Sequence, residues 1–366
     1  MIPKTTIPGL LTNHESMMQK RLIAGLALAT VILLAISGYL VLRWAQSPVA
    51  SGLPRPPSKI VTIPDGSTFQ QVVGMLKSEQ LIRSRWAFLL LGRSHDSDRK
   101  IRPGEYELDG SMSAQAILAK LLAGRVVLHP VTIPEGYNLS QIAEVFAAQQ
   151  VTDVQEFSKL VRDRTFIATL GIEADSLEGY LFPETYSFPR QAKARDVIKA
   201  MVDGLHRVWS AELQEQATRM KLSLHQVLTL ASVIEKETGS KEERELIAAV
   251  FHNRLRKKIP LQSDPTVIYG LPGFDGNIHK RDLSVMSPYN TYRVQGLPPG
   301  PIASPGAHSL RAALFPAQAS YLYFVSRNDG THQFSSTLAE HNQAVEKYQK
   351  QPFRKRTRGS LAVHGA

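Results

Sequence analysis

An uncharged run of 21 residues, Leu22–Leu42, limits what the N-terminal part of this chain can fold into. At a helical rise of 1.5 Å per residue, such a run spans about 30 Å, the thickness of the hydrocarbon core of a bilayer. Lys20–Arg21 and Arg43 flank the run, and Tyr39 and Trp44 suit a membrane interface. A cleaved signal peptide normally has a shorter apolar core, of about 7–15 residues. The run therefore predicts an uncleaved transmembrane helix over residues 22–42.

The charges around this run bear on its orientation. Basic residues lie at similar distances on both sides of it: Lys4, Lys20 and Arg21 before it, and Arg43, Arg55 and Lys59 after it. Only the adjacent pair Lys20–Arg21 favours a cytoplasmic tail over residues 1–21. Large domains are translocated largely regardless of their charge, so we expect the body of the chain outside the cytoplasm. Cleavage among the small residues 45–50 stays open as an alternative.

Composition narrows the functional classes. At 366 residues the chain has room for two domains. Its net charge of +11 lies partly in a basic tail, residues 351–366, and no helix-turn-helix, zinc-finger or RNA-binding signature accompanies it. We therefore expect the positive charge to attract anionic lipid or an anionic wall polymer, and we expect no binding of nucleic acid. The chain has no cysteine, no HExxH and no phosphate-binding loop, so no metal or cofactor is implied.

An internal echo divides the rest of the chain. After a Pro- and Ser-rich linker, residues 43–59, the sequence VTIPDGSTFQQ at 61–71 returns as VTIPEGYNLSQ at 131–141. Each copy predicts a short strand, a Pro–acid–Gly turn, a polar cap and an amphipathic helix, over Phe69–Glu79 and Leu139–Gln149. Two copies are too few for a solenoid, so one small unit is used twice. The first copy predicts a module over residues 60–128, and the second opens a larger domain over 129–350.

The run LTLASVIEKET at 228–238 contains the candidate chemistry. A carboxylate beside an apolar surface has a raised pKa and can hold a proton near neutral pH, as a general acid must. Glu237 continues the helical stripe of Val227, Leu230 and Ile234. The stripe of Glu235 is also apolar, so the spacing favours Glu237 only slightly. A capped helix end with two solvated glutamates is the alternative that this pattern leaves open.

Several segments occur in an order that is specific to one family. They are ASVIEKET, FHNRL, LQSDPTVIYG, SPYNTY, GLPPGPIASPG and YLYFV. The chain resembles the MltG-type (YceG-like) endolytic murein transglycosylases from the membrane span to about Tyr348, most strongly over residues 231–341. The resemblance implies that Glu237 is the catalytic acid and that peptidoglycan glycan strands are the substrate. It also implies cell-wall synthases as partners and an inner-membrane location, single-pass, with the body in the periplasm.

The expected fold is α+β, with an N-terminal transmembrane helix, a small LysM-like α/β module and a larger α+β catalytic domain. The LysM likeness of the first module implies glycan binding, and a simple spacer or packing module is the equal alternative. Within the larger domain, we expect a strand over residues 178–188, a helix over 194–220 and a hairpin over 321–335.

A lytic transglycosylase needs one carboxylate, whereas ordinary glycosidases use two. Eight residues beyond Glu237 are candidates to contact the substrate: Gln262, Ser263, Asp264, Thr266, Tyr289, Asn290, Thr291 and Tyr292. Their amides, hydroxyls and aromatic rings suit an acetamido sugar, and each also has a structural interpretation. Two other functions stay open: a hydrolase with Asp264 or Glu184 as second carboxylate, and a non-catalytic scaffold with a buried structural Glu237.

Overall fold

The chain forms two compact units that divide between Val127 and Leu128. The computed structural model describes residues 11–50, 56–93 and 101–351. The division lies one residue before the boundary expected from the sequence, and we call residues 1–127 unit 1 and residues 128–366 unit 2. The first ten residues and the basic tail from 352 onward lie outside the described residues.

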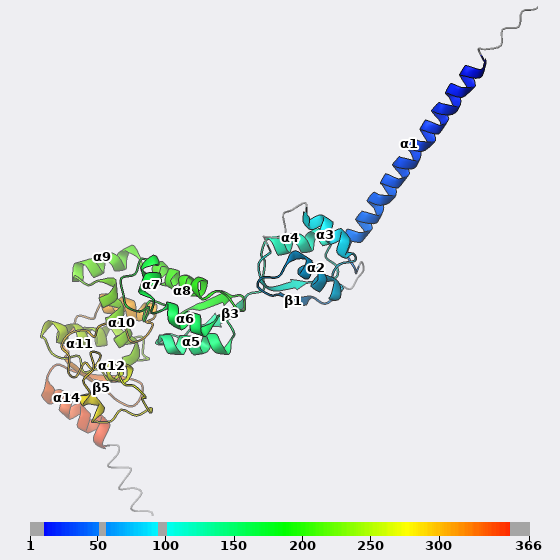
Figure 1. Ribbon diagram of the computed structural model, residues 1–366. Helices are drawn as coiled ribbons and strands as arrows, with labels where there is room; N and C mark the ends of the chain where they lie inside the picture. The colour runs from blue at the N-terminus through cyan, green and yellow to red at the C-terminus, as the bar shows by residue number, and fades with distance from the viewer. Residues whose placement is uncertain (1–10, 51–55, 94–100, 352–366) are drawn as a thin grey trace, which may run out of the picture. The chain divides into compact units, whose positions relative to one another are not determined.

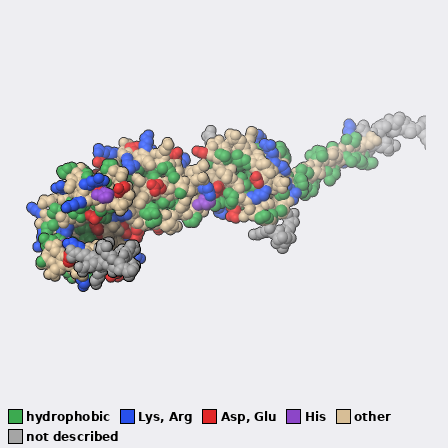
Figure 2. All heavy atoms as spheres, turned by 90° about the horizontal axis from the view of Figure 1, so that it is seen from below, with side chains coloured by type: hydrophobic (Ala, Val, Ile, Leu, Met, Phe, Trp, Pro, Cys, Tyr) green, Lys and Arg blue, Asp and Glu red, His purple; other side chains and the backbone are tan. Residues whose placement is uncertain are grey.

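Unit 1 begins with a single long helix. Its elements are α1 (Leu11–Gln46), β1 (Lys59–Ile63), α2 (Phe69–Ser78), α3 (Arg85–Arg93), β2 (Gly104–Leu108) and α4 (Ala114–Leu122). The stretch Met18–Gln46 of α1 is long and apolar enough to cross a membrane, and its apolar side chains lie uncovered (Figure 2). The helix continues past both ends of the predicted span, because no helix-breaking residue follows Leu42 before Gln46.

The end of α1 packs against unit 1 instead of leading into a free linker. The guanidinium of Arg83 lies 5.3 Å from the ring centre of Trp44. The same group donates to the backbone carbonyls of Pro48 at 2.9 Å and Val49 at 3.2 Å. The first part of the predicted linker is therefore fixed to this unit, while residues 51–55 lie outside the described residues.

A two-stranded antiparallel sheet, β1 with β2, forms the base of the module after α1. Val61 and Ile63 of β1 and Tyr106 and Leu108 of β2 point into the core, as period-2 alternation requires. The helices α2, α3 and α4 supply the rest of this core, with Phe88 fully buried. The element order strand–helix–helix–strand is complete before α4 begins.

Unit 2 repeats the opening of this module. Its elements are β3 (His129–Thr132), α5 (Leu139–Ala148), α6 (Val154–Leu160), α7 (Arg164–Thr169), β4 (Thr185–Phe188), α8 (Ala194–Val208), α9 (Ala211–Met220), α10 (Leu224–Glu237), α11 (Arg244–Arg256), α12 (Asp264–Tyr269), η2 (Asp282–Ser284), α13 (Ala307–Leu314), β5 (Tyr323–Ser326), β6 (His332–Ser335), α14 (Leu338–Val345) and η3 (Glu346–Lys350). Strand β3 pairs antiparallel with β4, as β1 pairs with β2.

The two copies of the echo have the same turn conformation and the same kind of helix cap. Gly66 and Gly136 both adopt positive φ, +73° and +77°, which glycine takes without strain. Thr68 and Asn138 both form a capping box with the glutamine three residues later. The two turns differ in their surroundings: Gly66 is exposed, whereas Gly136 is buried and its N–H donates to the carbonyl of Ser304 at 2.8 Å.

Helix α10 lies at the centre of unit 2 (Figure 1), where it contacts α11, α12 and α13. Ser223 caps its start through a capping box with Gln226. All eight residues from Val227 to Ile234 are buried, so the helix is covered on every side. The expected helix over 194–220 is wrong at one point, because it breaks at Trp209–Ser210, where Ser210 caps α9.

Two predicted β segments have different outcomes. The hairpin of β5 and β6 forms around Arg327–Gly330 as the sequence predicts. The strand expected over 178–188 is restricted to Thr185–Phe188. Gly179 has φ +79° and Pro183 has no N–H to donate, so the first half of this segment cannot continue a ladder.

Candidate active site

Glu237 is the last residue of α10 and the point at which this buried helix reaches the surface. Its side chain is only partly exposed. Burial raises the pKa of Glu237 to about 7, and the nearby negative charge of Asp264 acts in the same direction. A hydrogen bond from Ser263 and the positive charge of Arg254 act in the opposite direction. The group can therefore both hold and release a proton near neutral pH, which is what a general acid requires.

The loop before α12 places a hydroxyl on this carboxyl group. Ser263 is 1 % exposed, and its Oγ donates to Oε1 of Glu237 at 2.5 Å. The N–H of Ser263 donates in turn to Oγ1 of Thr291 at 2.9 Å, and that oxygen lies 2.8 Å from Oγ1 of Thr266. Gln262 has φ +51°, a conformation that is uncommon for a residue with a side chain. Such strain is concentrated at functional sites.

Arg254, from α11, is a residue of this site that the sequence analysis did not identify. It is 7 % exposed, and its guanidinium donates to the carbonyls of Leu261 and Leu322, both at 2.7 Å. Its positive charge favours the ionised form of Glu237. The available signal was its position three residues after Phe251, on the buried stripe of an amphipathic helix. A buried arginine in such a stripe needs several hydrogen-bond acceptors, because an unpaired buried charge is costly.

Tyr292 and Asp264 form a polar pair at the same end of α12. The hydroxyl of Tyr292 donates to Oδ1 of Asp264 at 2.7 Å. Asn290, by contrast, is fully buried, and its amide nitrogen donates to the carbonyls of Leu283 and Val285. These bonds fix the loop before Tyr292. A direct contact of Asn290, Thr266 or Thr291 with a ligand stays a prediction.

Tyr289 lies at a different place, at the other end of α12. It lines a cavity of about 290 Å³ together with Glu178 and His225. Its ring centre is 4.8 Å from that of Tyr269. Glu178 is 6 % exposed, accepts from the hydroxyl of Tyr269 at 3.1 Å, and has its pKa raised to about 7 by burial. Glu178 was not predicted from the sequence as a site residue, although a charged residue inside a run of core aromatics was an available indication.

Glu235, two residues before Glu237, has a structural role. Its side chain is 5 % exposed and Oε1 lies 2.9 Å from the guanidinium of Arg244. Its Oε2 accepts the N–H of Gly306, also at 2.9 Å. Both oxygens therefore have protein partners. Within the described part of the chain, the hydrogen bond of Glu237 involves Oε1 alone, which leaves Oε2 for a ligand.

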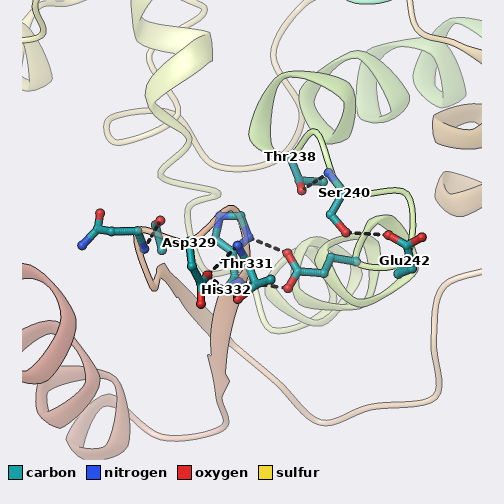
Figure 3. Close-up of polar contacts among 9 residues, drawn as sticks. Thr238, Ser240, Glu242, Asp329, Thr331 and His332 are labelled. Atoms are coloured by element: carbon teal, nitrogen blue, oxygen red, sulfur yellow. Dashed lines mark hydrogen bonds and ion pairs between the residues drawn. The ribbon is translucent and has the colours of Figure 1, made fainter.

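The segment that follows Glu237, residues 238–243, is held in place by polar contacts (Figure 3). Thr238 accepts the N–H of Ser240 at 2.9 Å, and the hydroxyl of Ser240 donates to Glu242. On the hairpin, His332 donates its backbone N–H to Glu243, and its Nδ1 lies 2.7 Å from the second oxygen of that carboxylate. These bonds join β6 to the loop after α10 and so restrict the end of the helix that bears Glu237.

The other sequence candidates are less favourably placed. Glu184 is half-exposed and pairs with Arg207 at 2.9 Å. Among the described residues, no group of three or more histidine, aspartate or glutamate side chains is close enough to hold a metal ion.

Comparison with known proteins gives a consistent result. A model of the YceG-like family matches residues 61–347. An endolytic murein transglycosylase of Bacillus subtilis is 37 % identical over 304 residues, which cover 79 % of this chain and 84 % of that protein. One from Streptococcus pneumoniae is 30 % identical over 323 residues, covering 79 % of this chain and 58 % of that protein. The crystal structure of a yceG-like protein from Listeria monocytogenes, 36 % identical, aligns with a TM-score of 0.55 over 78 % of this chain and 98 % of that chain.

The charges around Glu237 predict opposite effects of two substitutions on its pKa. Asp264→Asn removes a negative charge that disfavours the carboxylate, so the pKa of Glu237 should fall. Ser263→Ala removes a hydrogen bond to the carboxylate, so the pKa should rise. Infrared titration of the carboxyl band, with Glu237→Gln as the baseline, measures both shifts. Glu184→Gln is the matched control and should leave this titration unchanged. Shifts of the same sign in both variants would contradict the arrangement.

Proposed function

The chain belongs to the YceG-like family, and we propose that it is a membrane-anchored endolytic murein transglycosylase. It cleaves peptidoglycan glycan strands at the bond between N-acetylmuramic acid and N-acetylglucosamine and leaves 1,6-anhydro ends. One observation carries the proposal. The position at which the family resemblance expects the catalytic acid holds a partly exposed carboxyl group whose pKa burial raises to about 7. Cleavage inside nascent strands would terminate their elongation.

Glu237 suits a reaction that uses one carboxyl group twice. The protonated acid first donates its proton to the glycosidic oxygen, which leaves as a hydroxyl group. The resulting carboxylate then takes the proton of the muramic acid C6 hydroxyl, whose oxygen attacks C1 to close the anhydro ring. The proton that Glu237 gives in the first step returns in the second, and no water is consumed. Because the first step needs the protonated acid, cleavage should decline as the pH rises through about 7.

The neighbours of Glu237 support this cycle through position and charge. Ser263 holds Oε1 and so directs Oε2 toward the glycosidic oxygen. Arg254 stabilises the carboxylate that forms after proton donation. Asp264, held by the Tyr292 hydroxyl, places a negative charge near the reacting sugar, where an oxocarbenium-like transition state gains positive charge.

We assign glycan binding to groups at both ends of α12. Gln262, Asp264 and Tyr292 are at least partly exposed at the Glu237 end. At the other end, Tyr289 lines the cavity that contains Glu178, where an aromatic face and a carboxyl group suit a sugar with polar edges. We assign a supporting role to four buried residues that hold the loop before α12 and the loop around residue 290 in place through hydrogen bonds: Ser263, Thr266, Asn290 and Thr291.

The hydrolase alternative receives less support from these contacts. A second carboxylate must lie within reach of the same sugar, at about 5–9.5 Å from the first. Glu184 is engaged by Arg207. Asp264 is the better candidate because its charge raises the pKa of Glu237. A hydrolase leaves reducing ends, so the products separate it from a transglycosylase.

Helix α1 supports single-pass anchoring in the inner membrane. The N-terminus then lies in the cytoplasm and the catalytic body in the periplasm, where murein and the cell-wall synthases meet. We also propose that the module over residues 60–128 is LysM-like. Its strand–helix–helix–strand order and its exposed turn at Gly66 support a role in glycan binding.

Glu237→Gln and Glu235→Gln should have opposite consequences. Glu237→Gln keeps the shape but cannot donate a proton, so cleavage should fall by at least about 100-fold while stability is kept. Glu235→Gln removes the negative charge that pairs with the buried Arg244 at 2.9 Å and replaces one of the two acceptor oxygens with an NH2 donor, with Glu135 still 3.8 Å away. It should cost about 3 kcal/mol of unfolding free energy, the low end for a broken buried pair, yet retain much of the cleavage.

Digestion of purified murein followed by mass spectrometry measures both variants, and thermal unfolding measures their stability. Anhydro ends from the unmodified protein, lost in Glu237→Gln, are the expected result. Reducing ends would establish the hydrolase, and intact murein would establish the scaffold. An active Glu237→Gln beside a folded, inactive Glu235→Gln would reverse the assignment.

Removal of residues 58–127 tests whether the module binds glycan. If it tethers the enzyme to glycan, the truncated protein should bind insoluble sacculi less well than the full chain. Cleavage should be partly retained, because Glu237 and its contacts lie in unit 2. Unchanged binding by a folded truncated protein would contradict tethering.

An export reporter fused after Ala366 tests the orientation. A reporter that requires the periplasm should be active there, and one that requires the cytoplasm should be inactive. The reverse pattern would place the body on the cytoplasmic side.

A further inference from the structure

Helix α3 has an exposed apolar face that no other described element covers. Trp86 is 64 % exposed and Leu90, one turn later, is 42 % exposed. Ala87 and Phe88, on the other side of the helix, are fully buried in the core of unit 1. Arg93 projects on the exposed side at about 100° per residue. An indole and a leucine at helical spacing beside arginine form the amphipathic pattern of an interfacial helix.

The same helix lies beside the end of the candidate membrane span. Helix α1 contacts α3 (Figure 1), and Ala45, near the end of α1, is only 6 % exposed. Arg83, two residues before α3 begins, binds Trp44 and the carbonyls of Pro48 and Val49. Three separate contacts of one guanidinium therefore fix the start of α3 to the chain that leaves the bilayer.

The position along α1 sets the depth of α3. Trp44 lies two residues beyond Leu42, about 3 Å along the helix axis. The headgroup layer is about 5–8 Å thick on each side of the hydrocarbon core. Arg83, which contacts Trp44, therefore lies at the depth of the headgroup layer when Leu22–Leu42 spans the core. Helix α3 begins two residues later, so its first turn starts close to this layer.

We propose that α3 docks on the surface of the bilayer from which α1 emerges. Trp86 and Leu90 enter the interface, and Arg85 and Arg93 lie at the lipid phosphates. The inference goes beyond the catalytic activity and rests on the proposed membrane anchor.

The chemistry of the face selects lipid over a protein partner. The helix, RWAFLLLGR, contains two arginines and no acidic residue. Anionic headgroups attract such a charge, and the amphipathic indole ring is enriched at membrane interfaces. Unit 1 would then be held against the membrane by two attachments, the span of α1 and the face of α3.

The absence of cysteine from the chain allows a clean test. Single cysteines are introduced into the full-length protein at Leu90, at Leu33 within the span, and at Thr62 on the outward face of β1. Each carries the environment-sensitive fluorophore NBD, and the proteins are reconstituted into vesicles of phosphatidylcholine and phosphatidylglycerol. Quenching by aqueous iodide and by brominated lipid is then measured for each site.

Docking predicts that the probe at position 90 behaves like the probe at 33. It should be quenched by brominated lipid and be several-fold less accessible to iodide than the probe at 62. Adding Trp86→Ser should reduce lipid quenching at 90 and leave that at 33 unchanged. Circular dichroism checks folding, which this exposed position should not disturb.

Three outcomes would overturn the proposal in distinguishable ways. Equal iodide access at positions 90 and 62 would show that α3 faces water. Protection from iodide without quenching by brominated lipid would show that protein covers the face. Absence of lipid quenching at position 33 would instead show that the proposed anchor itself is wrong.

Discussion

Burial of the central helix α10 sets the chemistry of unit 2. Eight consecutive buried residues, Val227–Ile234, precede the end of the helix, and the carboxyl group there is itself largely withdrawn from water. The charged form loses hydration there, and a proton becomes easier to hold. Three neighbouring side chains then adjust the pKa of Glu237 that burial has raised. Ser263 and Arg254 favour the carboxylate, and Asp264 disfavours it, so the group is balanced between two states instead of being fixed in one.

The two glutamates of the EKET segment show how one short motif serves two purposes. Glu235 uses both oxygens, on Arg244 and on the N–H of Gly306, and so joins α10 to α11 and to the start of α13. Glu237 uses one oxygen. The pair is therefore an anchor followed by a reactive group. The anchor fixes the helix end against two neighbours, so that the reactive group is held in place by contacts that do not involve it.

The sequence alone predicted the parts of this structure that depend on local pattern. The echo, the polar caps of its two helices and the hairpin around Arg327–Gly330 all follow from periodicity and turn residues. Stripe spacing could not separate Glu235 from Glu237, because each lies on an apolar stripe. The difference depends on Arg244 and Gly306, which come from later in the chain. Arg254 was not predicted for the same reason, since its acceptors lie in loops that no local rule places beside α11.

The repeated turn has a different mechanical role in each copy. At Gly66 the Pro–acid–Gly turn faces solvent, so no other described part of the fold depends on its position. At Gly136 the same turn is buried against Ser304, and Lys236 also donates to its carbonyl at 3.3 Å. A change of the turn at Gly136 would displace the end of α10, whereas the same change at Gly66 would alter only an exposed loop. One local motif therefore serves as a surface turn in unit 1 and as a support for the end of the Glu237 helix in unit 2.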